Sequence, residues 1–151
     1  RTYLFKKLIK KVSKGIDKKE IFNLIDATIL TFVDQKFLND KYYSDAKTKA
    51  FYRRGYSLNK IRYNLIKKGI DKKYIKDSIS KIKEEESDPD FFSAIKMCKR
   101  RRIGACRDES NRTLFYKKDI SILARAGFSY EVAKKVLEIP KKEFQQFCKM
   151  I

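Results

Sequence analysis

Arginine is concentrated near residue 100 of this chain, in a pattern suited to binding anions. The cluster consists of Lys96, Lys99, Arg100, Arg101, Arg102 and Arg107. Each guanidinium group offers a planar fork of donors that matches a phosphate or a carboxylate. We therefore predict a binding site for nucleic acid or for a protein partner here, with a plain solvated surface as the alternative.

Helical spacing indicates how this cluster would be displayed. On a helix over about 89–102, the side chains of Phe91, Ile95 and Cys98 share one face. The basic side chains of the same segment then project from the opposite face. An apolar face would hold the helix against a core and leave the cations accessible.

A second group of cations forms a further candidate binding site. It consists of Arg53, Arg54, Lys60, Lys67 and Lys68. Helical projection places Lys60 and Lys67 opposite Ile61 and Leu65.

The residue types that usually perform catalysis or hold metals are scarce. The sequence has no histidine, the commonest general base and metal ligand. Its cysteines, Cys98, Cys106 and Cys148, are odd in number and show no CxxC spacing. We expect no catalytic residue, no metal, no cofactor and no enzymatic activity. Reduced thiols indicate a cytoplasmic protein.

The net charge of +19 predicts a polyanionic partner. Nucleic acid is the first expectation, an anionic membrane the second and an acidic protein surface the third. No apolar run approaches the length of a membrane span, so we expect no membrane association of that kind.

The elements that must position these cations are predicted to be helices. Apolar residues recur at helical spacing, as in Leu58, Ile61 and Leu65, and no segment shows the alternation of a strand. The predicted fold is all-α.

Four short motifs predict tight corners between helices. Each has glycine, an apolar residue and then Ser or Asp: Gly15-Ile16-Asp17, Gly55-Tyr56-Ser57, Gly69-Ile70-Asp71 and Gly127-Phe128-Ser129. Glycine accepts the left-handed conformation that ends a helix. Ser or Asp can cap the next helix by accepting a hydrogen bond from its free N–H groups.

The corners belong to an internal repeat. The hexapeptide KGIDKK occurs at 14–19 and at 68–73, and a related segment, RAGFSY, follows at 125–130. We predict tandem three-helix repeats in an elongated, bent array. The predicted repeats cover 1–38, 39–87 and 88–151, the last with a C-terminal tail.

The predicted helices follow from this register. They cover about 2–14, 17–36, 41–54, 57–68, 71–86, 89–102, 108–126 and 129–138, with a short tail helix after Pro140. The first helix of the first repeat is expected to precede Arg1.

Several aromatic residues have two possible roles. They are Tyr42, Tyr43, Phe51, Tyr56 and Phe128. They could stack on unpaired bases, but aromatics at helix corners usually fill small cores, which is the interpretation we favour.

Taken together, these segments resemble the RecX family, bacterial regulators of the RecA recombinase. The resemblance is carried by FLNDKYYSDAKTKAFYRRGYSLNKIRYNLIKKGIDKKYI (37–75) and CKRRRIGACRDESNRTLFYKKDISILARAGFSYEVAKKVL (98–137). It extends over most of the chain and is weakest in the first repeat, which has Val12-Ser13-Lys14 as extra residues.

The resemblance implies a function that composition and spacing do not. Such proteins are tandem three-helix repeats that bind RecA, often as its filament on single-stranded DNA, and limit filament growth. The resemblance therefore implies a non-catalytic regulator of recombination and the SOS response, and several relatives also bind single-stranded or duplex DNA. We expect this chain to act as a monomer. Two alternatives stay open: a helical nucleic-acid-binding module without a recombinase role, and an adaptor for an acidic protein.

Overall fold

The all-helical prediction is confirmed. The structure is a computed structural model that describes residues 1–11 and 17–151. Within these ranges the regular elements are helices, without a strand. The chain separates into two compact units, Arg1–Asn39 and Asp40–Ile151. The predicted boundary between the second and third repeats, at 87/88, stays a prediction.

The first unit pairs helix α1, Thr2–Leu8, with helix α2, Lys18–Asp34. The Phe5 ring stacks on Phe22 with 4.3 Å between the ring centroids. Side-chain burial on α2 is nearly complete at Ile21 and Ile25.

The first helix is shorter than the predicted 2–14, because α1 ends at Leu8. Lys6 and Lys10 are four residues apart, as are Lys7 and Lys11. Like charges at this spacing oppose helix formation, which accounts for the early end. The predicted corner at Gly15 lies outside the described residues.

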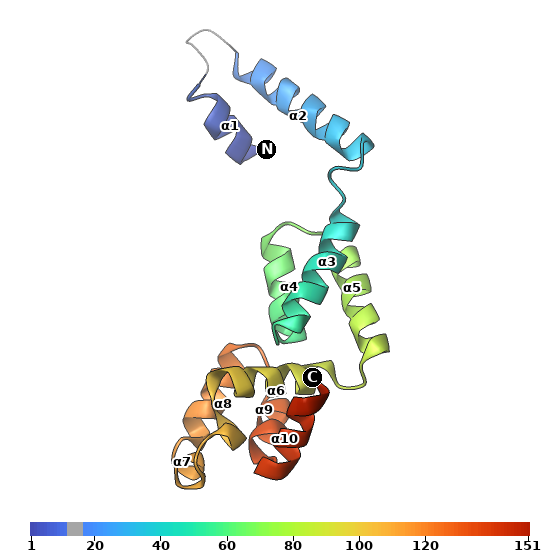
Figure 1. Cartoon of the computed structure of the whole chain (residues 1–151). Coiled ribbons are helices and arrows are strands. Elements are labelled where there is room, and N and C mark those ends of the chain that lie inside the picture. Colours follow the sequence, from blue (N-terminus) through green and yellow to red (C-terminus); the bar gives the residue numbers. More distant parts are fainter. Residues whose placement is uncertain (12–16) are drawn as a thin grey trace. The chain divides into compact units, whose positions relative to one another are not determined.

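The second unit begins with three helices: α3, Asp40–Arg53, α4, Leu58–Lys67, and α5, Lys72–Glu85. They pack on one another (Figure 1). The core of this group is built mainly from Ile61, Leu65, Ile75, Ile79 and Ile82. Ile61 and Leu65 belong to the apolar stripe that the sequence predicts for this segment.

A polar seam joins α3 to α5. Ser44 is fully buried on α3, and its hydroxyl donates to the Tyr74 carbonyl over 3.2 Å. On α5, the Ser78 Oγ lies 2.7 Å from Asp45 Oδ1. Lys81 Nζ donates to Asp45 Oδ2 over 2.6 Å. Burial alone would raise the pKa of Asp45, but the hydrogen bonds from Lys81 and Ser78 lower it overall.

The rest of the second unit packs around helix α6, Pro89–Arg101. It continues with η1, Gly104–Cys106, α7, Glu109–Leu114, α8, Tyr116–Arg125, α9, Tyr130–Glu138, and α10, Lys141–Met150. Ile95 and Cys98 of α6 are fully buried against Leu123, Val136 and their neighbours. The apolar face of α6 is therefore the one that the sequence predicts.

The predicted helix 108–126 is wrong in one respect, since it is broken at Phe115 into α7 and α8. The guanidinium of Arg107 lies over the Phe115 ring, 4.7 Å from its centroid. From α7, Arg112 Nη2 donates to the Leu137 carbonyl over 2.6 Å. We attribute the break to these contacts, because they turn α7 toward the end of α9.

The predicted corners are confirmed at three positions. Gly55, Gly69 and Gly127 have φ angles of 74°, 81° and 88°, in the left-handed region. The residues two positions later, Ser57, Asp71 and Ser129, each accept a hydrogen bond from a backbone N–H of the following helix.

Alanine substitutions should separate backbone strain from close packing at these corners. A Cβ at Gly55 would lie 2.9 Å from Lys96 Cβ and 3.0 Å from the Ser93 carbonyl oxygen, whereas one at Gly69 meets nothing within 4 Å. We expect Gly69→Ala to lower the free energy of unfolding by about 1 to 2 kcal/mol, from backbone strain alone. Gly55→Ala should cost about 2 to 4 kcal/mol, because overpacking is added. Urea denaturation followed by circular dichroism measures both, and equal losses would contradict the close approach.

Candidate functional site

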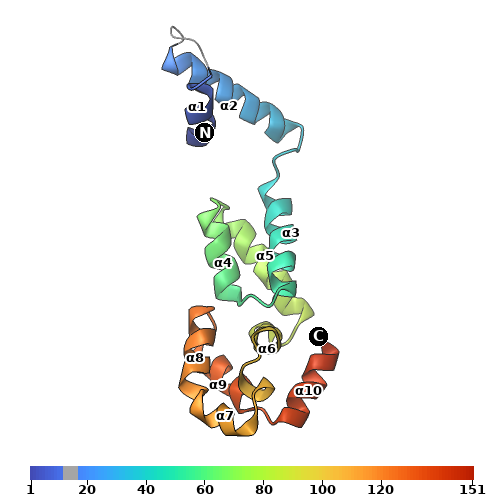
Figure 2. The same cartoon turned by 60° about the vertical axis from the view of Figure 1, so that its left-hand side comes forward.

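The start of α4 is held against the group of helices around α6. The Ser57 hydroxyl donates to the Ala126 carbonyl over 2.8 Å and accepts from Lys60 N at 3.1 Å. The Asp90 carboxylate accepts from Leu58 N over 2.7 Å. Figure 2 shows the end of α8 facing the start of α4 beside α6. Together these contacts define a junction between the two helix groups of the second unit.

Burial at this junction shifts the pKa of a nearby acidic side chain, Asp90. Burial raises the pKa of the Asp90 carboxyl, and the hydrogen bond from Leu58 N–H lowers it in part. The acid is used structurally, because it caps the first turn of a helix from another part of the chain.

The end of α3 is held against α6 in the same region. Arg100 Nη1 donates to the Arg54 carbonyl over 2.7 Å. The Lys96 ammonium lies 4.8 Å from the centroid of the Tyr52 ring, and burial raises the pKa of the Tyr52 hydroxyl to about 12. These contacts bring the two predicted groups of cations together.

A pocket of about 390 Å³ opens at this junction. We call it the junction pocket, and it is lined by Gly55, Tyr56, Lys60, Met97, Arg100, Arg101, Ile122, Arg125 and Ala126. Four of these residues are basic and none is acidic. The pocket therefore presents positive charge around an apolar floor.

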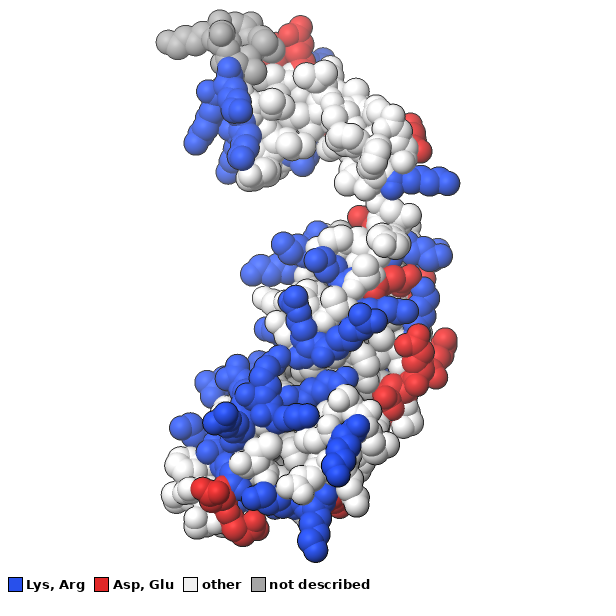
Figure 3. All heavy atoms as spheres, viewed as in Figure 1, with Lys and Arg blue, Asp and Glu red and all other residues white. Residues whose placement is uncertain are grey.

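A second depression, which we call the outer hollow, lies next to it. It is lined by Arg53, Lys96, Lys99, Arg100 and Ile151. Arg100 belongs to both surfaces. In Figure 3, Lys and Arg atoms gather over α6 and the adjoining helix ends. The result is a continuous cationic surface across α3, α4, α6 and α8.

Some predicted site residues do not line either of these two depressions. Lys67 and Lys68 are exposed at the far end of α4. Arg102 is exposed and ends α6 in a left-handed conformation, with φ 54°. Arg54 is exposed and contributes its carbonyl to Arg100.

Arg107 is engaged within the fold. Its Nε and Nη2 donate to the two carboxylate oxygens of Asp119, over 2.8 and 2.7 Å. The Asp119 side chain is only 1% exposed, and it also accepts from Gly104 N. The bidentate pair holds η1 against α8 and uses the donors that would otherwise reach a phosphate.

Arg125 belongs to the junction pocket but is missing from the predicted site. The repeat pattern could have identified Arg125, because it precedes the corner glycine Gly127 by two positions, as Lys67 precedes Gly69. The sequence predicts Lys67 as a site residue, whereas in the structure Arg125 lines the pocket and Lys67 does not.

The cysteines are unpaired and are poorly suited to nucleophilic chemistry. Burial raises the pKa of Cys98 to about 12 and also raises the pKa of Cys106 and Cys148. In the described part of the chain, no group of His, Cys, Asp or Glu is arranged to hold a metal ion. None of the described helices combines the length and apolar character of a membrane span.

Measurements of the free energy of unfolding can distinguish the structural role of Arg107 from the exposed position of Arg101. Arg107→Gln leaves the buried Asp119 carboxylate without its charged partner, so we expect the free energy of unfolding to fall by about 2 kcal/mol. The matched variant Arg101→Gln removes an exposed charge and should change it by less than about 0.5 kcal/mol. Urea denaturation provides the measurement. A neutral Arg107→Gln would contradict the structural role of that pair.

Comparison with known proteins gives three relatives that share one name. The regulatory protein RecX of Myxococcus xanthus is 27% identical over 144 residues, covering 91% of this chain and 76% of that protein. The RecX proteins of Clostridioides difficile and Clostridium tetani are 26% and 30% identical, covering 83% and 85% of this chain. The aligned regions span 51% and 56% of those two proteins. No family model and no solved structure matches. On these matches, the chain belongs to the RecX family.

Proposed function

We propose that this chain is a non-catalytic regulator of the RecA recombinase, acting in homologous recombination and the SOS response. It binds the recombinase or its filament on single-stranded DNA and inhibits filament growth or activity. The relatives are named regulatory proteins, and the recombinase as target comes from the family resemblance.

The observation that carries the proposal is the cationic surface formed by the junction pocket and the outer hollow. Among the residues lining these two depressions, none is acidic. The two linings contain seven basic residues and no acidic side chain: Arg53, Lys60, Lys96, Lys99, Arg100, Arg101 and Arg125. A nucleoprotein filament is a long polyanion, and neutralising its phosphates releases counterions.

The cellular location and the oligomeric state form part of the same proposal. We propose that the chain acts in the cytoplasm as a monomer. Its unpaired cysteines are compatible with a reducing compartment. A helical nucleic-acid-binding module without a recombinase role is the second candidate, favoured by the net charge of +19.

Filament assembly on single-stranded DNA with ATP tests the main proposal. We expect the chain to slow or reverse filament growth when present well below one copy per recombinase. A regulator that acts at growing or exposed sites does not need to coat the DNA. Inhibition only at concentrations that coat the DNA would favour the second candidate and contradict the proposal.

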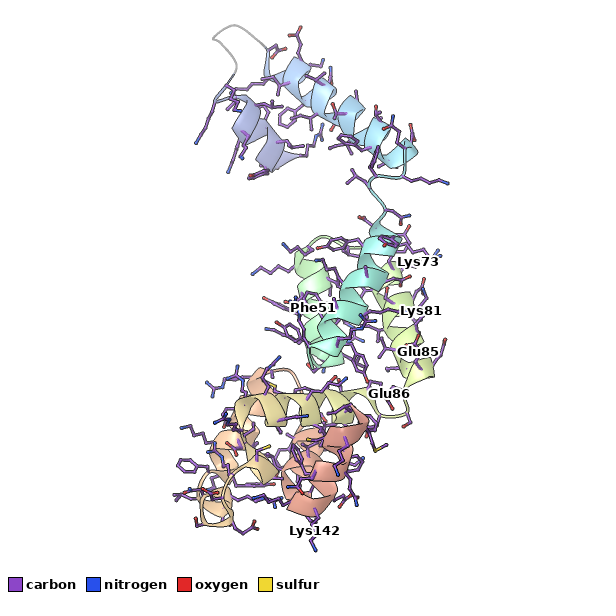
Figure 4. All side chains as sticks on the ribbon, viewed as in Figure 1. Phe51, Lys73, Lys81, Glu85, Glu86 and Lys142 are labelled. Atoms are coloured by element: carbon purple, nitrogen blue, oxygen red, sulfur yellow. The ribbon has the colours of Figure 1, made fainter. Side chains whose placement is uncertain are left out.

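Charge reversal locates the binding surface through its salt dependence. Arg100→Glu combined with Arg101→Glu should weaken DNA binding and reduce the salt slope by about 1 to 2, since each lost phosphate contact removes about 0.7 for a single strand. Lys141→Glu combined with Lys142→Glu makes the same change in net charge, and Lys142 extends away from the group around α6 (Figure 4). Fluorescence anisotropy at several salt concentrations measures the slope. Equal effects of the two variants would show that only net charge matters.

A further inference from the structure

The junction pocket has an apolar floor that the binding of phosphate alone would not need. Met97, Ile122 and Ala126 line it beneath the cations. Met97 is 6% exposed and belongs to the core, while Ile122 and Ala126 are partly buried beside the core. The floor is thus the edge of the core around α6. A ligand that fills it must bring an apolar group along with its anions.

Three of the four cations at the rim are oriented before any ligand arrives. Arg100 is fixed by its hydrogen bond to the Arg54 carbonyl, over 2.7 Å. Arg125 Nε donates to the Ser121 carbonyl over 3.2 Å. The Lys60 ammonium lies 5.5 Å from the centroid of the Tyr63 ring. These contacts leave most of the guanidinium donors available, so little conformational entropy is lost on binding.

The ligand must therefore place an apolar group between anionic groups. Neighbouring side chains of an extended acidic peptide point to opposite sides, so an apolar residue and the adjacent carboxylates do not face one pocket together. Paired DNA keeps its bases stacked inside the duplex, so it presents phosphates, sugars and base edges but no whole base that could enter a pocket. A single DNA strand carries a flat base between two phosphates in every repeating unit, and unstacked bases are available to proteins.

The volume of the junction pocket and its connection with the outer hollow both fit a single DNA strand. A volume of about 390 Å³ lies in the range of pockets that hold small organic groups. The outer hollow shares Arg100 with the junction pocket, so a strand leaving one depression meets further cations in the other.

We propose that the junction pocket holds one unpaired base of a single DNA strand, with the flanking phosphates bound by Arg100, Arg101, Lys60 and Arg125. The inference rests on the proposed function in taking the cationic surface as the contact with a nucleoprotein filament. It adds a reason for selecting single strands over duplex, which charge alone does not provide.

Filling the pocket without changing its charge tests this inference. In Ala126→Leu the added side chain occupies the floor, and Ile122→Phe does so from the preceding turn of α8. Ala124→Leu adds the same apolar group at an exposed position of α8 and serves as the matched control. Binding of each full-length variant is measured by anisotropy with three DNA probes of equal length, about 12 nucleotides: oligothymidine, an abasic strand and a duplex.

We expect both pocket variants to bind oligothymidine about fivefold or more weakly than the unchanged chain, in line with the loss of one stacked base. Binding to the abasic strand and to the duplex should stay unchanged, which also shows that the variants are folded. Ala124→Leu should match the unchanged chain on all three probes. Equal loss on all probes, or no loss on oligothymidine, would overturn the inference.

Two competitors separate other occupants of the pocket. Thymidine monophosphate should not displace oligothymidine at micromolar concentration, and such displacement would assign the pocket to a free nucleotide. A glutamate-rich peptide whose binding falls in Ala126→Leu as much as that of oligothymidine would assign it to a protein. Either result would overturn the inference.

These measurements contain no recombinase, so they are independent of the proposed regulation. Base-dependent binding by a chain that leaves RecA filaments unchanged would retain the inference and reject the proposed function.

Discussion

Hydrogen bonding at the first turn of α4 is the constraint on which the rest of the second unit depends. Ser57 caps its own helix and also donates to the Ala126 carbonyl at the end of α8. Asp90, from the first turn of α6, accepts from Leu58 N–H. A free N–H group of α4 is thus satisfied from α6, and a free carbonyl at the end of α8 is satisfied by the residue that caps α4. Loss of either contact would leave buried polar groups without partners and loosen the cationic surface.

Local features of the fold could be predicted because they depend on neighbouring residues. The corner glycines need only a left-handed residue at a helix end, and Ser57, Asp71 and Ser129 cap helices that begin next to them. The break at Phe115 could not be predicted. It depends on Arg107 and on the end of α9, which folding brings to the segment from elsewhere in the chain.

The candidate site shows the same division between local and distant causes. The two groups of cations are visible in the sequence, but their meeting depends on α6 packing against the end of α3. Arg107 looks like its neighbours in the sequence and differs only because Asp119 is buried beside it. Arg125 is solitary along the chain and joins the others only because the start of α4 lies against the end of α8.

The polar seam between α3 and α5 has a consequence for the alignment of helices. Apolar side chains can slide past one another with little penalty, whereas hydroxyl and carboxylate groups have partners at fixed positions. Moving α3 along its axis by one turn, about 5.4 Å, would separate Asp45 from both Ser78 and Lys81. Figure 4 shows Lys81 on the α5 helix that provides this seam. The seam therefore fixes the position of α3 along its axis. Arg53 lies at the other end of α3, so its distance from α6 is set by hydrogen bonds that form two turns away.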